Sequence, residues 1–383
     1  MDPFEHSVDT TPADTGPRRP VSLRVGRRVA ESGTANACYF RSGADPGRRK
    51  ALLQITERCD LRCAHCFVSA TQSGSDMSLE DVAAAISRLG AARVSHVTLT
   101  GGEPFVHHEI LPIVELLVHH ELSVTICTNA VSVTSEHIDS LSRLPGVGVN
   151  VSLDGFSSDS HGQFRGDRSS FDVTVANARR LADAGLLKGI LCTPNTLAEQ
   201  SEYAEVYQFA KDLGAEYVLM NPLSSFGRGM SAGRRLRADD LTMRSIQADV
   251  QRAAGAPDGP EAVFIRFPND SEPLSGCIAG EVVYVFVNGD TAVCPYLVFA
   301  AKNAVSQHTP DEFIAANLFQ DGDFAARLDA YDFHGRYRVP NNPTCGACGI
   351  KGSCGSGCPA AVVASGGRIG DLDTDVCPRP DAQ

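Results

Sequence analysis

Residues 51–66 read ALLQITERCDLRCAHC, an apolar, strand-like stretch (51–56) followed closely by three cysteines. Cys59, Cys63 and Cys66 are separated by three and then by two residues. Each of the four irons of a [4Fe–4S] cluster needs a ligand, and so short a loop supplies three. The remaining iron is then open, which suits a cluster that binds a substrate or cofactor directly. A zinc site is the alternative, but structural zinc sites are closed by four protein ligands.

Beyond this loop, strand-like and helical stretches alternate. Expected strands lie at 51–56, 95–100, 122–128, 147–154, 188–193 and 216–221, and expected helices at 78–90, 107–120, 134–143, 170–185 and 199–213. Ser78, with Asp81 three residues later, is a capping signal for the first helix. Six such units predict an α/β fold, a partial (β/α)6 TIM-like barrel, with function at the carboxyl ends of its strands.

The pattern also predicts how the chain is divided. We expect a partly disordered extension at 1–48 with a short hairpin formed by 21–29 and 36–42, a barrel at 49–235, a linker with one helix at 236–270, and a cysteine-rich domain at 271–383. Asn288-Gly289 between alternating apolar stretches predicts a β-hairpin in the last domain. The final forty or so residues have too little apolar periodicity to fold without metal ligation.

The composition of the 383-residue chain argues against several classes of protein. A net charge of −12 argues against non-specific nucleic-acid binding. No apolar run approaches the roughly 18 residues that span a bilayer, and the first twenty residues lack the apolar core of a signal peptide. We therefore expect a cytoplasmic protein without nucleic-acid or membrane partners. In that reducing compartment, 13 cysteines indicate metal or cluster ligation rather than disulfides.

Gly101-Gly102-Glu103-Pro104 directly follows the second expected strand, and its glycines allow close backbone approach. Together with the cysteine spacing and Phe67 after the last cysteine, this motif makes roughly residues 50–225 resemble the radical S-adenosylmethionine (SAM) superfamily. The resemblance implies that SAM binds the open iron and is reductively cleaved. The resulting 5′-deoxyadenosyl radical would abstract a hydrogen atom from the substrate. It also implies that residues 101–104 bind SAM, with Glu103 near its amine.

Three further matches concern single residues. Ser152 and Asp154 in VSLDG resemble positions near the SAM ribose and carboxylate, and Arg165 resembles an arginine that pairs with that carboxylate. Asn129 lies in Thr-Asn-Ala, which resembles the usual Thr-Asn-Gly with Ala130 in place of the glycine. A capping or surface role is the alternative for each residue taken alone.

Seven cysteines follow the expected barrel: Cys277, Cys294, Cys345, Cys348, Cys354, Cys358 and Cys377. Their spacing, with Gly289 between the first two, resembles the SPASM extension of radical SAM enzymes, which holds two auxiliary [4Fe–4S] clusters. The resemblance implies three [4Fe–4S] clusters in this chain. It implies a distal auxiliary cluster ligated by Cys345, Cys348, Cys354 and Cys377.

A second auxiliary cluster, nearer to the active site, would be ligated by Cys277, Cys294 and Cys358. Its fourth ligand is not assigned: either another residue closes the cluster or it is open for substrate. The auxiliary clusters would transfer electrons or bind substrate, and a purely structural role is the alternative.

Cys38, Cys127 and Cys192 remain. Cys192, near the end of an expected strand, is a candidate hydrogen-atom donor, as is Cys127, although most such cysteines are small buried hydrophobes. Cys38 is a candidate for the missing ligand.

The resemblance implies an oxidoreductase that receives electrons from a reductase such as flavodoxin or ferredoxin. The expected substrate is a ribosomally made peptide that is crosslinked, epimerised or oxidised. One alternative is oxidation, epimerisation or decarboxylation of a sugar, aminoglycoside or nucleoside intermediate. The other is a non-catalytic iron–sulfur protein, against which the GGEP motif and the open loop argue.

Overall fold

A computed structural model describes residues 33–39, 45–255, 258–337 and 342–378. Most of the expected extension at 1–48, including its disorder and the first arm of its hairpin, lies outside these residues. Residues 36–39, the described part of the second arm, form no strand, and Ala35 just before them makes an isolated parallel bridge with Leu274.

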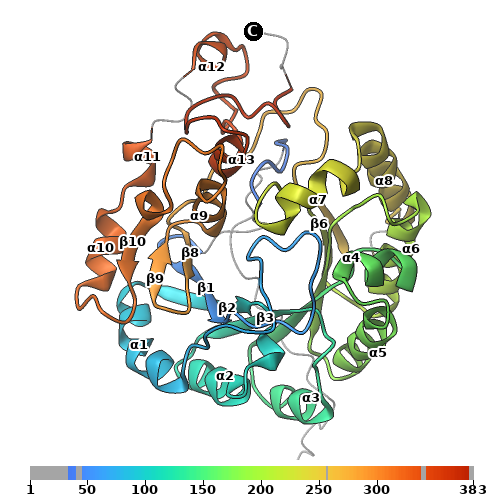
Figure 1. The fold of residues 1–383 in the computed structure, drawn as a ribbon, viewed down its shortest axis with the longest axis vertical. Coiled ribbons are helices and arrows are strands. Elements are labelled where there is room, and N and C mark those ends of the chain that lie inside the picture. The colour runs from blue at the N-terminus through green and yellow to red at the C-terminus, as the bar shows by residue number, and fades with distance from the viewer. Residues whose placement is uncertain (1–32, 40–44, 256–257, 338–341, 379–383) are drawn as a thin grey trace, which may run out of the picture.

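A single ten-stranded sheet runs through the molecule in the order β10-β9-β8-β1-β2-β3-β4-β5-β6-β7 (Figure 1). Its parallel strands are β1 (Arg49–Thr56), β2 (Val94–Gly101), β3 (Ser123–Thr128), β4 (Val147–Ser152), β5 (Leu187–Cys192), β6 (Tyr217–Met220) and β7 (Glu261–Phe264). Because each pairs with the next in chain order, their carboxyl ends meet at one edge. The partial barrel predicted from the sequence is confirmed as the fold class.

Helices cover the outside of this curved sheet (Figure 1). They are α1 (Leu79–Ala91), α2 (Ile110–His119), α3 (Ser135–Leu141), α5 (Ser170–Asp183), α6 (Gln200–Asp212) and α8 (Asp240–Ala253), each lying between two successive strands in the chain. Ser78 and Asp81 form the expected capping box at α1, which satisfies amide groups that the first turn leaves unpaired. The core between the layers is aliphatic and includes Leu53, Val97 and Leu117, all at most 1% exposed.

Two features of the sheet were not expected: the strand β7 and the pairing of the C-terminal hairpin with β1. The segment 236–270, expected as a linker with one helix, contains that helix as α8 but also supplies β7, which pairs with β6. The expected hairpin forms as β8 (Val282–Val285) and β9 (Asp290–Ala292), and β8 pairs in parallel with β1. Gly289 in its turn has a φ of +85°, which a glycine adopts without strain. The hairpin thus continues the barrel sheet.

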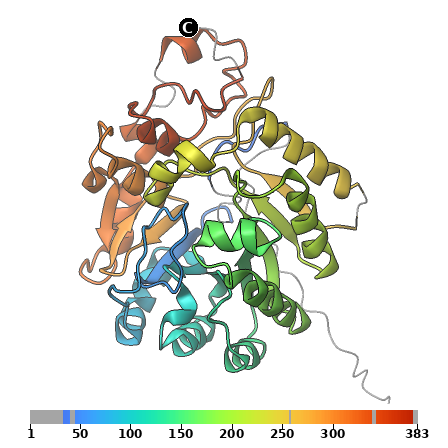
Figure 2. The same ribbon diagram turned by 45° about the vertical axis from the view of Figure 1, so that its right-hand side comes forward.

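The C-terminal part lies at one end of the molecule (Figure 2). It comprises β10 (Ile314–Asn317), α9 (Pro295–Ala301), α10 (Phe324–Ala330), α11 (Phe333–Arg336), α12 (Pro343–Ala347) and α13 (Pro359–Ala364). Helices α9 and α13 share a second apolar core with Tyr39 and Phe226.

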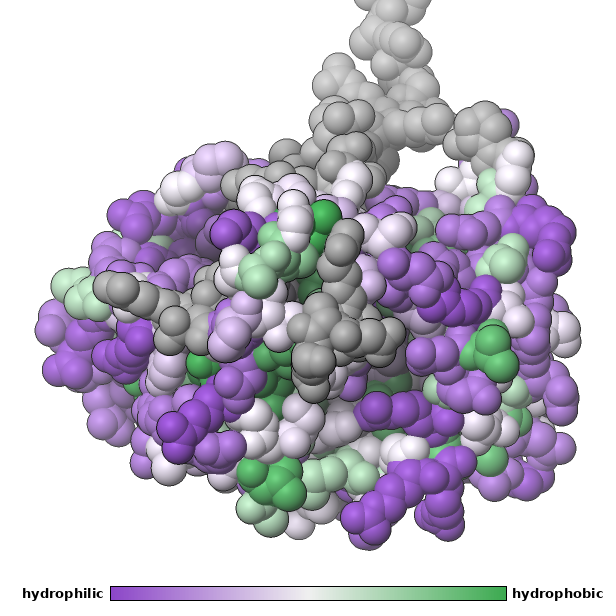
Figure 3. Space-filling view, turned by 90° about the horizontal axis from the view of Figure 1, so that it is seen from above, coloured by the Kyte–Doolittle hydropathy of each residue, from purple (hydrophilic) through white to green (hydrophobic). Residues whose placement is uncertain are grey.

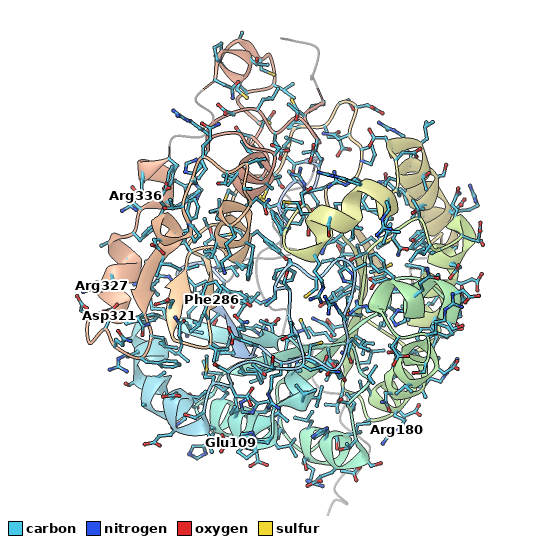
Figure 4. All side chains as sticks on the ribbon, in the orientation of Figure 1. Glu109, Arg180, Phe286, Asp321, Arg327 and Arg336 are labelled. Carbon is cyan, nitrogen blue, oxygen red and sulfur yellow. The ribbon has the colours of Figure 1, made fainter. Side chains whose placement is uncertain are left out.

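Charged side chains lie mainly on the surface of the molecule. Figure 4 shows Arg180, Arg327 and Arg336 at the outer rim, and Figure 3 shows a mostly hydrophilic face with small separate hydrophobic patches. None of the helices in the described ranges is both long and apolar enough to cross a membrane.

A buried ion pair joins the C-terminal tail to the segment after β7. The Arg266 guanidinium donates to both carboxylate oxygens of Asp373 at 2.6 and 2.9 Å, and both side chains are 2% exposed. Arg244 and Asp270 form a pair of similar geometry, at 2.6 and 2.7 Å, but are 40% and 74% exposed. The two pairs differ in burial, and Arg266 also donates to Ala37 O and Asp375 Oδ2.

We therefore expect Arg266→Met to lower the free energy of unfolding by about 3–5 kcal/mol, because it leaves the Asp373 carboxylate buried without its partner. Arg244→Met is the matched control and should cost less than about 1 kcal/mol, since water screens an exposed pair. Chemical denaturation of both variants measures the difference. Equal losses would contradict this account of the tail.

Candidate active site

A cavity of about 270 Å³ lies at the carboxyl ends of the barrel strands. Its lining contains all the candidate residues of the barrel except Pro104: Cys59, Cys63, Cys66, Gly101, Gly102, Glu103, Asn129, Ser152, Asp154, Arg165 and Cys192. Pro104 is buried at the start of a short 3-10 helix, Pro104–Val106. The structure therefore brings together residues that are up to 133 positions apart, Cys59 and Cys192.

The two glycines of the GGEP motif hold the cysteine loop against the end of β2. Gly102 N–H donates to Thr56 O and Glu103 N–H to Arg58 O, both at 2.9 Å. A Cβ on Gly101 would meet Thr56 O at 2.3 Å, and one on Gly102 would meet Arg58 O at 2.0 Å. Only glycine permits this approach, which places the residue before Cys59 directly beside Glu103.

The Glu103 carboxylate is buried and accepts three hydrogen bonds. Thr128 Oγ1 and Phe105 N–H donate to Oε1 at 2.6 and 3.1 Å, and Asn129 N–H donates to Oε2 at 2.7 Å. Burial, and secondarily the Asp60 carboxylate, raises the pKa of Glu103 to about 7. A cation placed in the cavity would stabilise its ionised form, so the site favours a positively charged ligand group.

Asn129 connects the end of β3 to the cysteine loop. Its side chain donates to Asp60 Oδ1 at 2.7 Å, and Asp60 Oδ2 accepts from Ser132 at 2.6 Å. The following Ala130 has a φ of +63°, in the left-handed region that favours glycine. The turn that the resemblance describes with a glycine is therefore built here with an alanine.

Asp154 and Arg165 form a buried ion pair on the opposite side of the cysteine loop. Arg165 Nε donates to Asp154 Oδ2 at 2.6 Å, and its Nη1 lies 3.8 Å from Cys63 Sγ. Thr193 N–H donates to Asp154 Oδ1 at 2.8 Å. Burial opposes ionisation of Asp154, but the Arg165 guanidinium outweighs it and lowers the pKa of Asp154. Asp154 therefore orients Arg165, whose charge faces the thiols.

Sequence reasoning missed two residues that support the loop. His65 stacks on Phe164 at 4.5 Å, and burial lowers its pKa to about 4. Arg228 opens α7 (Arg228–Leu236) and donates to Cys63 O at 2.8 Å and to Ala70 O at 2.7 Å. Residues 225–235 are rich in Ser, Gly and Arg and gave no signal for a helix that closes over this loop.

Three further side chains lie at or near the carboxyl ends of the barrel strands. Ser152 ends β4 and Cys192 ends β5, whereas Cys127 lies one residue before the end of β3. Burial raises the pKa of the Cys192 thiol well above its usual value, so the thiol keeps its proton at neutral pH. Such a group can donate hydrogen but is a poor nucleophile.

The seven downstream cysteines form two groups. Cys345, Cys348, Cys354 and Cys377 line a separate cavity of about 150 Å³. Cys277, Cys294 and Cys358 lie in the second apolar core, near Tyr39 and Tyr296, which also line the barrel cavity. The four thiols that the resemblance assigns to the distal cluster thus share one cavity, and the other three share one apolar core.

The donors fit iron–sulfur clusters better than single ions. No three His, Cys, Asp or Glu side chains in the described part of the chain converge on one metal ion. A cubane spreads its thiolates over separate irons, so thiols spaced around a cavity suit it. In the barrel cavity, the buried Asn221 Oδ1 and Thr98 Oγ1 have no hydrogen-bond partner, as expected of a site that takes a polar ligand.

Comparison with known proteins agrees with this geometry. Residues 53–206 match the radical SAM superfamily. Mycofactocin maturase MftC of Mycobacterium tuberculosis is 28% identical over 323 residues, 82% of this chain and 78% of MftC. The subtilosin biosynthesis protein AlbA of Bacillus subtilis, named for an antilisterial bacteriocin, is 30% identical over 183 residues, 47% of this chain and 40% of AlbA.

Among solved structures, Streptococcus suis SuiB bound to its precursor peptide SuiA shares the fold. The TM-score is 0.68 at 18% identity, and the match covers 85% of this chain and 75% of SuiB. The match to the superfamily and the cavity that joins the cysteine loop to the GGEP turn support one conclusion, including a [4Fe–4S] cluster and SAM as cofactors. Residues 53–206 are a radical SAM domain, and the protein that carries it is similar over most of its length to the maturase MftC.

Proposed function

We propose that the protein is a maturase that modifies a ribosomally synthesised peptide by radical chemistry. The observation that carries the proposal is the similarity to MftC over 323 residues, which extends well beyond the radical SAM match at 53–206. The partial similarity to the bacteriocin protein AlbA supports a peptide substrate.

The cavity supplies a role for each group in the proposed site. Cys59, Cys63 and Cys66 would ligate the catalytic cluster, and Glu103 would accept hydrogen bonds from the SAM amine. Arg165, oriented by Asp154, would pair with the SAM carboxylate. Bound together, the cluster and SAM supply reductive cleavage of the sulfonium C–S bond.

The remaining cavity residues would place SAM and the substrate. Gly101 and Gly102 would let the SAM amine approach the backbone, while Asn129 and Ser152 would position its ribose. Cys192, protonated at the end of β5, would face the substrate and could return a hydrogen atom to it.

Two auxiliary clusters complete the proposal. The distal one would use the four thiols around the 150 Å³ cavity, Cys345, Cys348, Cys354 and Cys377. The nearer one would use Cys277, Cys294 and Cys358, beside aromatic rings that reach the barrel cavity. A cytoplasmic flavodoxin or ferredoxin would deliver the electron that starts the reaction.

The test uses the anaerobically reconstituted full chain. We expect roughly twelve irons per chain, four for each of three cubanes. With SAM and dithionite the protein should release 5′-deoxyadenosine, and with the peptide encoded by a short neighbouring reading frame it should change the mass of that peptide.

Each result separates one reading from another. A value near four irons would remove the auxiliary clusters. Absence of 5′-deoxyadenosine would contradict the assigned site. Deoxyadenosine without any peptide product, but with turnover of a sugar or nucleoside, would replace the peptide by a small-molecule substrate.

A further inference from the structure

The auxiliary cluster proposed for Cys277, Cys294 and Cys358 lacks a fourth ligand, and the structure places another thiol among these three. The Cys38 thiol donates to Gly276 O at 3.2 Å and lies 3.7 Å from Gly357 O, so it sits beside the residues immediately before Cys277 and Cys358. Cys38, Cys294 and Cys358 are 3%, 7% and 5% exposed, whereas Cys277 is only partly buried. All four cysteines belong to the second apolar core, so the Cys38 thiol lies in the same cluster as the other three.

Backbone pairing fixes Cys38 in this position. Ala35 N–H donates to Pro273 O at 2.8 Å and Ser275 N–H donates to Ala35 O at 2.9 Å, so residues 35–37 run alongside 273–275. Ala37 N–H adds a bond to Ser275 Oγ at 2.8 Å. The segment that carries Cys38 is therefore held beside the segment that leads into Cys277.

A third segment, which leads into Cys358, packs against the paired segments 35–37 and 273–275. Gly355 N–H donates to Leu274 O at 2.7 Å, and Gly276 pairs with Ser356. A Cβ on Gly355 would meet Gly276 Cα at 2.3 Å, so this approach requires glycine. Three chain segments thus converge on one group of thiols.

The Arg266–Asp373 ion pair also holds two of the chain segments that carry these thiols. Arg266 N–H donates to Asn36 O at 2.6 Å and its Nη1 donates to Ala37 O at 3.1 Å. Asp373 Oδ2 accepts from the Cys358 N–H at 2.9 Å. One buried ion pair therefore positions the backbone just before Cys38 and that of Cys358 itself.

We propose that Cys38 is the fourth ligand of the auxiliary cluster held by Cys277, Cys294 and Cys358, an inference that rests on the auxiliary clusters of the proposed function. With four thiolates the cluster has no open iron. It cannot bind substrate directly and acts by electron transfer beside Tyr39, which follows Cys38 and lines the barrel cavity. Cluster assembly also fastens the N-terminal segment to the C-terminal tail.

The test isolates the auxiliary clusters in the full chain by replacing Cys59, Cys63 and Cys66 with alanine. This parent should hold about eight irons. Isotopically labelled cyanide, a probe for an open iron, should show no coupling to the EPR signal of its dithionite-reduced clusters. Adding Cys38→Ala should create that coupling, and mild oxidation should then yield a [3Fe–4S] signal with loss of about one iron.

Ser275→Ala is the matched control, because it removes the hydrogen bond from Ala37 and leaves all four thiols in place. It should retain about eight irons without cyanide coupling. If Cys38→Ala loses the whole cluster while Ser275→Ala keeps it, the proposal also holds, and Cys38→Ser should then retain part of the iron.

Two results overturn the proposal. Eight irons and no cyanide coupling in Cys38→Ala would show that Cys38 is not a ligand and leave the proposed function intact. A parent with far fewer than eight irons would remove the auxiliary clusters themselves, and the proposed three-cluster enzyme with them.

Discussion

Replacing Cys59, Cys63 and Cys66 together by alanine should abolish cleavage of SAM. The three thiols line the barrel cavity with Glu103 and Arg165, and no other cysteine of the chain lies in this loop. Without them the catalytic cluster has no protein ligand, so dithionite cannot deliver an electron to SAM. Chromatography of 5′-deoxyadenosine measures the loss, and iron analysis should fall by about four irons per chain.

Cys127→Ala provides the control for iron content. Its thiol also lines the cavity but contacts Asn150 Nδ2 at 3.8 Å rather than the cysteine loop. This variant should keep the full iron content. Cleavage of SAM that survives the triple replacement would mean that the cluster loop is assigned wrongly.

Gly102→Ala should have a large effect for the addition of a single methyl group. The added Cβ would lie 2.0 Å from Arg58 O and 3.0 Å from Cys59 Cβ, so the cysteine loop must move away from the GGEP turn. We expect a loss of about 3 kcal/mol in the free energy of unfolding. A displacement of the loop by about 1 Å should also slow SAM cleavage roughly a hundredfold.

Gly90→Ala makes the matched comparison. Gly90 lies in α1, where a Cβ would meet nothing within 4 Å. Gly90 is the second-last residue of α1, where alanine is favoured over glycine by less than the roughly 1 kcal/mol of a helix interior, so this variant should have a normal or slightly higher melting temperature and cleave SAM at the normal rate. Thermal melts and initial rates of SAM cleavage measure the difference between the two variants. A Gly102→Ala protein with normal rate and stability would contradict the assigned close approach.

The parts of the fold that local sequence could predict are those with strong periodicity or a specific turn. Apolar stretches located β1 to β6, Ser78 and Asp81 marked the start of α1, and Asn288-Gly289 marked the hairpin. In contrast, β7 has four residues, and the Gly- and Pro-rich stretch before it reads as a loop. Pairing with β6, which is a tertiary contact, makes it a strand.

The candidate site also contains parts that the sequence could predict and parts that it could not. Spacing alone grouped the thiols of the cysteine loop and those of the tail, because their separations are short or follow a known pattern. It could not place Cys38, which lies 238 positions before its contact Gly276. Nor could it identify Arg228, whose role depends on how α7 folds back over the loop.

The pairing of β8 with β1 has a further consequence for how much of this chain can be removed. A partial barrel is open at β1, and an uncovered edge strand presents free N–H and C=O groups to any neighbouring chain. Residues 282–285 occupy that edge along 50–53. A shortened protein that ends after β7 would therefore be expected to self-associate through β1, whatever its iron content. The C-terminal part therefore protects the barrel sheet against aggregation through its exposed edge.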